Sequence, residues 1–128
     1  MKSASEAYAR IARETAPPRE LEATLLLTAA ARLQAIYDAW KGKKPQGFDE
    51  ALLYNRRLWT VLLNSVTHND NRLPAKVREN ITRLGVWIMA ETYSLMTDPK
   101  PDHLTSIIRI NRVPHLQGRL KLDLPRAA

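Results

Sequence analysis

Residues 50–67, EALLYNRRLWTVLLNSVT, decide the fold class of this chain because their apolar residues recur every three or four positions. That spacing places side chains on one face of an α-helix. The apolar stripe consists of Leu52, Leu58, Trp59, Leu62 and Val66. We therefore predict a helix over residues 50–67, with Asp49 as its N-terminal cap.

The same periodicity recurs before and after this segment, and prolines or glycines separate the stretches. The other predicted helices span residues 3–13, 19–41, 75–97 and 103–112. We expect Asp102 to cap the last helix, and Pro114 to stop it near Arg112. Short loops between amphipathic helices are typical of a bundle. The sequence thus predicts an all-α fold, a single-domain bundle of about five helices over residues 1–128.

The basic character of the chain is concentrated towards its two ends. Its formal net charge is +7, of which residues 1–44 carry +3, residues 45–98 none and residues 99–128 +4. Residues 119–128 alternate basic and apolar side chains, which predicts an irregular, flexible basic tail. A duplex-binding domain usually gathers its charge on one face or helix. We therefore interpret most of this charge as an ordinary basic surface.

The composition points away from catalysis and from a membrane span. There is no cysteine, and the three histidines stand beside turn residues rather than at metal-ligand spacing. Phosphate-binding and nucleophile motifs are absent from the sequence. The start of the chain is not a secretory signal, and no apolar run approaches the roughly 20 residues of a membrane span. We expect a cytoplasmic protein that is not an enzyme and has no cofactor or metal.

Two asparagines interrupt otherwise apolar helix faces. Asn55 lies between Leu52 and Trp59 on one stripe, and Asn111 continues the stripe of the helix over residues 103–112. A buried amide is costly unless it is hydrogen-bonded. One interpretation is that the two amides bond to each other and fix the register between helices.

The alternative is that the asparagines form a polar anchor at the mouth of a groove, where the neighbouring arginines would be donors to a partner. A tryptophan at the rim of such a groove would be a binding hot spot, although packing in the core is the simpler interpretation. The candidate partner-binding residues are Tyr54, Asn55, Arg56, Trp59, Asn111 and Arg112.

These patterns, in this order, resemble a known family. The chain carries Ala7-Tyr8, then Pro18-Arg19-Glu20, then Asn55-Arg56-Arg57-Leu58-Trp59, then Leu73-Pro74 and finally Ile110-Asn111-Arg112. Over about residues 5–118 it is similar to the flagellar biosynthesis regulators of the FlaF family. Val113-Pro114 departs from that family, in which an unbroken apolar helix is expected to lead to a final glycine such as Gly118.

The resemblance implies a role in flagellin synthesis or secretion, in partnership or opposition with the regulator FlbT. It implies no enzyme activity and no cofactor. We expect the chain to bind the terminal helices of flagellin as an export chaperone does, through an apolar groove left open on the bundle. The alternative is a post-transcriptional regulator that binds flagellin mRNA through its basic stretches, or that binds FlbT.

Overall fold

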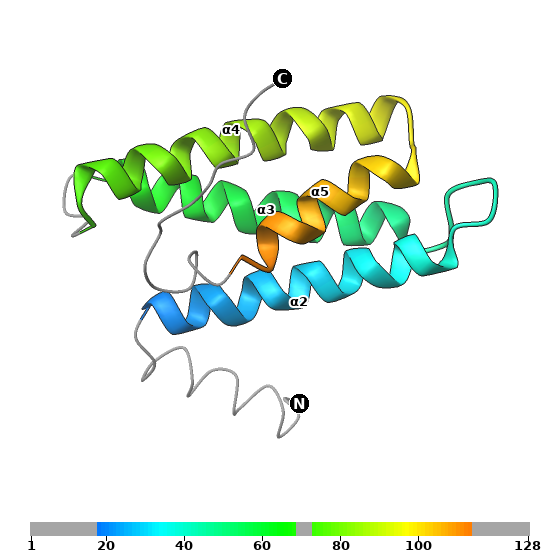
Figure 1. The fold of residues 1–128 in the computed structure, drawn as a ribbon, viewed down its shortest axis with the longest axis horizontal. Coiled ribbons are helices and arrows are strands. Elements are labelled where there is room, and N and C mark those ends of the chain that lie inside the picture. Colours follow the sequence, from blue (N-terminus) through cyan, green and yellow to red (C-terminus); the bar gives the residue numbers. More distant parts are fainter. Residues whose placement is uncertain (1–17, 69–72, 114–128) are drawn as a thin grey trace, which may run out of the picture.

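The computed structural model describes residues 18–68 and 73–113 (Figure 1). This part of the chain consists of helices joined by short loops, and it contains no strand. The helices are α2 (Pro18–Ala39), α3 (Phe48–Thr67), α4 (Ala75–Thr97) and α5 (Pro101–Asn111). The predicted all-α fold is confirmed, with four helices in the described residues. The predicted helix over residues 3–13 and the predicted tail over residues 119–128 lie outside them.

The four helices run alongside one another (Figure 1). α2 packs against both α3 and α5, while α3 packs against α4, and α4 has a smaller contact with α5. In Figure 1, α4 lies along the top and α2 along the bottom, with α3 and the short α5 between them. Every helix therefore buries one face against its neighbours and leaves another face outside.

α3 begins at Phe48, two residues earlier than its periodicity predicts. Gly47 precedes it in the left-handed conformation, with φ of 91°, which glycine adopts without steric cost. The prediction that Asp49 caps this helix is wrong, because Asp49 lies within the first turn and no side-chain cap is present. Its carboxylate still complements the positive end of the helix, and it lies 3.4 Å from the ammonium of Lys44.

α5 begins at Pro101, and the prediction of Asp102 as its cap is also wrong. Proline suits the first helical position, because an N–H there would have no acceptor within the helix and its absence costs no hydrogen bond. Asp102 lies in the first turn, where its charge is favourable. The helix ends at Asn111 with Arg112 as the flanking residue, which confirms the predicted stop before Pro114.

The apolar stripes predicted from the sequence largely form the core. The stripe of α3 is buried throughout, as are most predicted positions of α2, α4 and α5. Tyr37 has the same three- or four-residue spacing in α2 as the buried Leu33, but 36% of it is exposed. Trp40 is half-buried and packs edge-on against Phe48, with ring centroids 5.5 Å apart. All four helices contribute buried apolar residues to the core, including Leu26, Leu33, Trp59, Leu62, Ile88, Leu95, Leu104 and Ile107.

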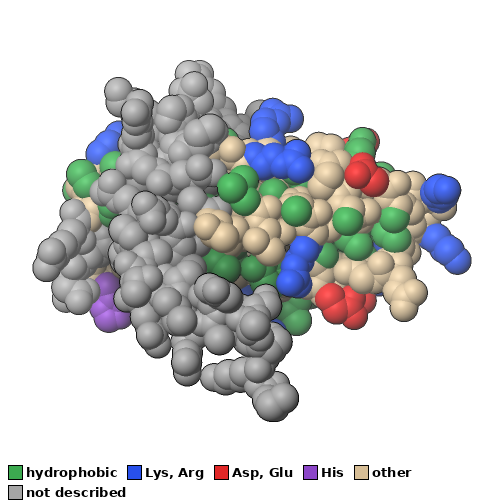
Figure 2. Space-filling model, turned by 90° about the horizontal axis from the view of Figure 1, so that it is seen from below, with side chains coloured by type: hydrophobic (Ala, Val, Ile, Leu, Met, Phe, Trp, Pro, Cys, Tyr) green, Lys and Arg blue, Asp and Glu red, His purple; other side chains and the backbone are tan. Residues whose placement is uncertain are grey.

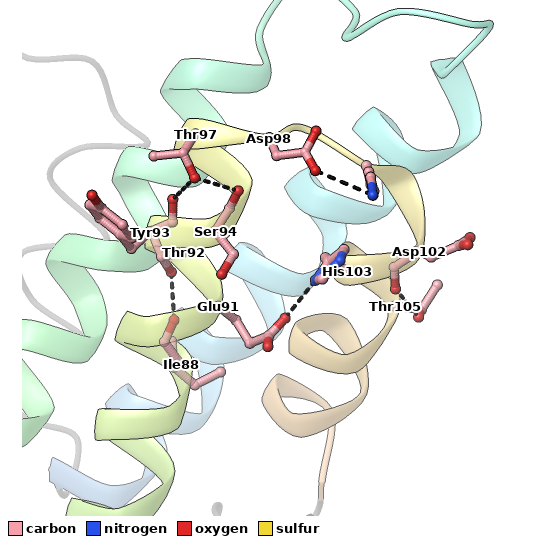
Figure 3. A network of polar contacts seen from close by, with 11 residues as sticks. Ile88, Glu91, Thr92, Tyr93, Ser94, Thr97, Asp98, Asp102, His103 and Thr105 are labelled. Carbon is pink, nitrogen blue, oxygen red and sulfur yellow. Dashed lines mark hydrogen bonds and ion pairs between the residues drawn. The ribbon is translucent and has the colours of Figure 1, made fainter. Parts of the chain in front are cut away.

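A polar contact joins α4 to the start of α5 (Figure 3). His103 Nδ1 lies 2.9 Å from Glu91 Oε2, and both side chains are partly buried. In the same view, the hydroxyl of Thr92 donates to the carbonyl oxygen of Ile88 one turn earlier, at 2.7 Å. The sequence shows His103 only as one of three histidines beside turn residues, so its contact with Glu91 could not be predicted from it.

At Gly85, α4 packs directly against the side chain of Leu63 on α3. A Cβ atom at this position would lie 2.7 Å from Leu63 Cγ and would also overlap both methyl groups of that side chain. Leu63 therefore occupies the space that any larger residue at position 85 would need. This contact explains a glycine in the middle of α4, where its helix propensity is about 1 kcal/mol poorer than that of alanine.

We predict that Gly85→Ala destabilises the chain by about 1 kcal/mol, because overpacking outweighs the gain in helix propensity. In a Leu63→Ala background, the same substitution should instead stabilise by up to about 1 kcal/mol, since the clash is gone. Urea unfolding of the four chains in a double-mutant cycle measures both values. Equal effects of Gly85→Ala in the two backgrounds would show that Leu63 is not the obstacle.

Candidate functional site

A buried polar network connects α3 to α5. The indole nitrogen of Trp59 donates to Asn111 Oδ1 at 3.0 Å, and Asn111 Nδ2 donates to Asn55 Oδ1 at 2.6 Å. All three residues are 0% exposed. The interpretation that the two amides bond to each other is thus confirmed, and this contact links α5 to α3.

The chemistry of Trp59 fixes the direction of both hydrogen bonds. An indole N–H only donates, so the oxygen of the Asn111 amide must face it. The nitrogen of Asn111 then faces Asn55, whose oxygen must accept. This leaves Asn55 Nδ2 without a partner among the described residues, although it is buried. The network is directional, and its one unsatisfied donor lies at the α3 end.

The six candidate partner-binding residues divide into an interior and an exterior group. Asn55, Trp59 and Asn111 have no exposed surface, so in this conformation they hold the bundle together and cannot contact a partner. Arg56 and Arg112 are exposed, but they line different grooves. Tyr54 is half-buried, with the guanidinium of Arg32 4.2 Å from its ring centroid. The structure therefore does not bring the six together into one site.

Arg56 lines an apolar groove between α3 and α4 with a volume of about 150 Å³. Its most accessible apolar residues are Leu53, which is 41% exposed, and Met96, which is 56% exposed. The hydroxyl of Thr92 already donates to the carbonyl oxygen of Ile88 in its own helix, so a bound molecule need not supply an acceptor for it. The residues that line the groove are Asp49, Leu52, Leu53, Arg56, Thr92 and Met96.

The charges of this α3/α4 groove stand at different points along α3. Asp49 lies seven residues before Arg56, which is about 10 Å along a helix. Asp49 is paired with Lys44, whereas Arg56 has no ion pair with the described residues. An occupant with apolar side chains along its length and a carboxylate near Arg56 would complement the groove.

A metal site and a membrane-spanning helix each set requirements that can be compared with the described residues. No cluster of three or more His, Asp or Glu side chains among the described residues is placed to hold a metal ion. Within the same residues, no helix combines the length and apolarity that crossing a bilayer requires.

Periodicity alone does not reveal the residues that open this groove. Leu53 and Met96 lie beside the apolar stripes of their helices, and only their residual exposure in the packed bundle distinguishes them. A weak signal exists in the sequence, since α3 and α4 hold more large apolar residues than one stripe each requires. Which of those surplus residues meet depends on how the two helices pair.

The fold and the groove define a small helical-bundle protein with an open apolar surface. A family model described as flagellar protein FlaF matches residues 4–113. The chain belongs to the FlaF family, and it is a flagellar protein. No curated protein and no solved structure matches it.

We predict that Asn111→Leu destabilises the bundle more than Asn55→Leu, by about 1–3 kcal/mol. The first substitution leaves the indole of Trp59 and the amide oxygen of Asn55 without partners. The second removes a donor that is already unsatisfied and leaves only Asn111 Nδ2 unpaired. Chemical denaturation of the two variants measures the difference, and equal losses would indicate that the network contributes only through packing.

Proposed function

We propose that this flagellar protein binds an amphipathic terminal helix of flagellin in the α3/α4 groove and so promotes flagellin synthesis or secretion. The open apolar groove, with Leu53 and Met96 exposed along it, is the observation that supports this proposal. An amphipathic helix presents apolar side chains three and four residues apart, which suits a groove between two helices.

Exposed apolar residues are concentrated on the two helices that form this groove, and two of them, Leu53 and Met96, line it. Of the seven large apolar residues that stay exposed in the described part of the chain, five belong to α3 and α4 and two to α2. Large apolar side chains on a surface are a common mark of a protein–protein contact when they gather together. The five are Leu53, Val61, Val86, Tyr93 and Met96.

The size of the groove indicates a binding mode of moderate strength. Covering the accessible parts of two or three aliphatic side chains contributes a few kcal/mol at about 25 cal/mol per Å². Part of that gain offsets the entropy lost when two molecules associate. Micromolar affinity corresponds to about 8 kcal/mol, so the apolar surface that the flagellin helix itself buries and a carboxylate paired with Arg56 must supply the rest. Affinity in that range suits a chaperone that must release its cargo.

Binding of this kind would act directly on the cargo. An amphipathic helix of unassembled flagellin exposes an apolar face that favours self-association. While the α3/α4 groove covers that face, the subunit stays unassembled and available for export. An RNA-binding role has less support, because the groove is apolar and carries Asp49, whose carboxylate would repel phosphate.

The test is isothermal titration calorimetry of the full chain with purified flagellin. We predict micromolar binding, and a loss of at least about tenfold for Leu53→Asp, because a carboxylate would replace an apolar contact. Leu27→Asp is the matched control, since Leu27 is 44% exposed but lies on α2, which does not line the groove.

An absence of binding at micromolar flagellin would contradict the proposal. An equal loss of flagellin affinity in the two variants would show that the binding surface is not the α3/α4 groove. If the chain instead captures FlbT, or a flagellin leader RNA whose binding weakens with salt, flagellin is not the primary partner.

A further inference from the structure

A second groove runs between α2 and α5, the two helices that do not line the first. It has a volume of about 300 Å³ and is more polar than the α3/α4 groove. Ile108 contributes buried apolar surface to it, and the partly exposed ring of Tyr37 lies on the α2 side. The residues that line it are Gln34, Tyr37, Thr105, Ile108, Arg109 and Arg112.

This α2/α5 groove has positive charge and no acidic lining residue. Arg109 and Arg112 are three positions apart, and such a spacing places side chains on neighbouring parts of one helix face. Neither has an ion pair with the described residues. On α2, the carboxylate of Asp38 accepts a hydrogen bond from Gln34 Nε2 at 2.9 Å. Because no ion pair with the described residues engages Arg109 or Arg112, both guanidinium groups remain available to an incoming anion.

We propose that the α2/α5 groove binds an acidic, amphipathic peptide segment of a partner protein. Two carboxylates of the segment pair with Arg109 and Arg112, and an apolar side chain packs against Tyr37 and Ile108. Arginine suits this recognition, because its planar guanidinium can donate two parallel hydrogen bonds to one carboxylate.

The buried network gives the groove a fixed edge. Asn111 is held by Trp59 and Asn55, and the next residue is Arg112. The backbone N–H of Arg112 also bonds to the carbonyl oxygens of Ile108 and Arg109, each at 3.1 Å. The backbone that carries Arg112 is thus set in place before a partner arrives, which lowers the entropic cost of binding.

The chain's own C-terminal segment is a poor occupant for this groove. Residues 114–128 follow directly from its edge, but they carry Arg119, Lys121 and Arg126 against a single acidic residue, Asp123. Like charges would oppose their binding beside Arg109 and Arg112. An acidic segment from another protein has the complementary sign.

A nucleic acid fits less well than a peptide. Binding to a phosphate backbone uses a continuous basic stripe or patch. Figure 2 shows the molecule from below the view of Figure 1, and on its described surface the basic side chains stand in small groups among apolar and neutral ones. Two arginines beside an aliphatic residue match a short acidic peptide more closely than a polyanion.

The test is fluorescence anisotropy of the full chain with a labelled 14-residue peptide that carries leucines and pairs of glutamates three residues apart. We expect binding that falls at least about tenfold in the double variant Arg109→Gln/Arg112→Gln. The control, Lys76→Gln/Arg83→Gln, removes the same charge from α4 and should change binding less than about twofold. Circular dichroism confirms that both variants stay folded.

Three results would overturn the proposal. They are no binding of the acidic peptide, an equal loss in the α4 control, and binding of a single-stranded RNA oligonucleotide that depends on the same two arginines. A peptide with lysine in place of glutamate should not bind. Because the assay contains no flagellin and leaves Leu53 unchanged, its failure would not affect the role proposed for the α3/α4 groove.

Discussion

The amide of Asn111 is the contact on which the arrangement of this bundle depends. It accepts from the indole of Trp59 and donates to Asn55, so one side chain of α5 is tied to two positions on α3. α5 has only 11 residues, and a helix of that length is marginal in water without tertiary contacts. Its apolar residues provide burial, while Asn111 selects a single register, because sliding the helix would leave buried polar groups unpaired.

That interior explains how the same helices can present open surfaces. α3 has its network on one side and the α3/α4 groove on another, while α5 has Asn111 inside and Arg112 at its outer edge. Asn55-Arg56 and Asn111-Arg112 are thus parallel pairs, each with an amide in the core and a guanidinium beside a groove. A rigid interior reduces the entropy that binding must offset at either groove.

Much of this fold follows from the sequence, because three- and four-residue periodicity reports directly on helical faces. The bounds of α4 are as predicted, and the pairing of Asn55 with Asn111 was one of the two interpretations that their positions on apolar stripes allowed. The cap residues were not predicted correctly. α3 begins after a glycine in the left-handed conformation and α5 begins at a proline, so both helices start before the aspartates that were expected to cap them. The sequence also could not show that Arg56 and Arg112 line different grooves, because this depends on which helices pack against each other.

The most direct measurement of this central contact is hydrogen exchange at the indole N–H of Trp59, followed by NMR. Trp40 and Trp87 are half-buried and serve as internal references. If the network holds α5 in place, the Trp59 indole exchanges only when the whole bundle unfolds, with the same opening free energy as the slowest core amides. Exchange as fast as that of Trp40 or Trp87, while the α3 backbone stays protected, would show that α5 detaches and that the network does not fix the bundle.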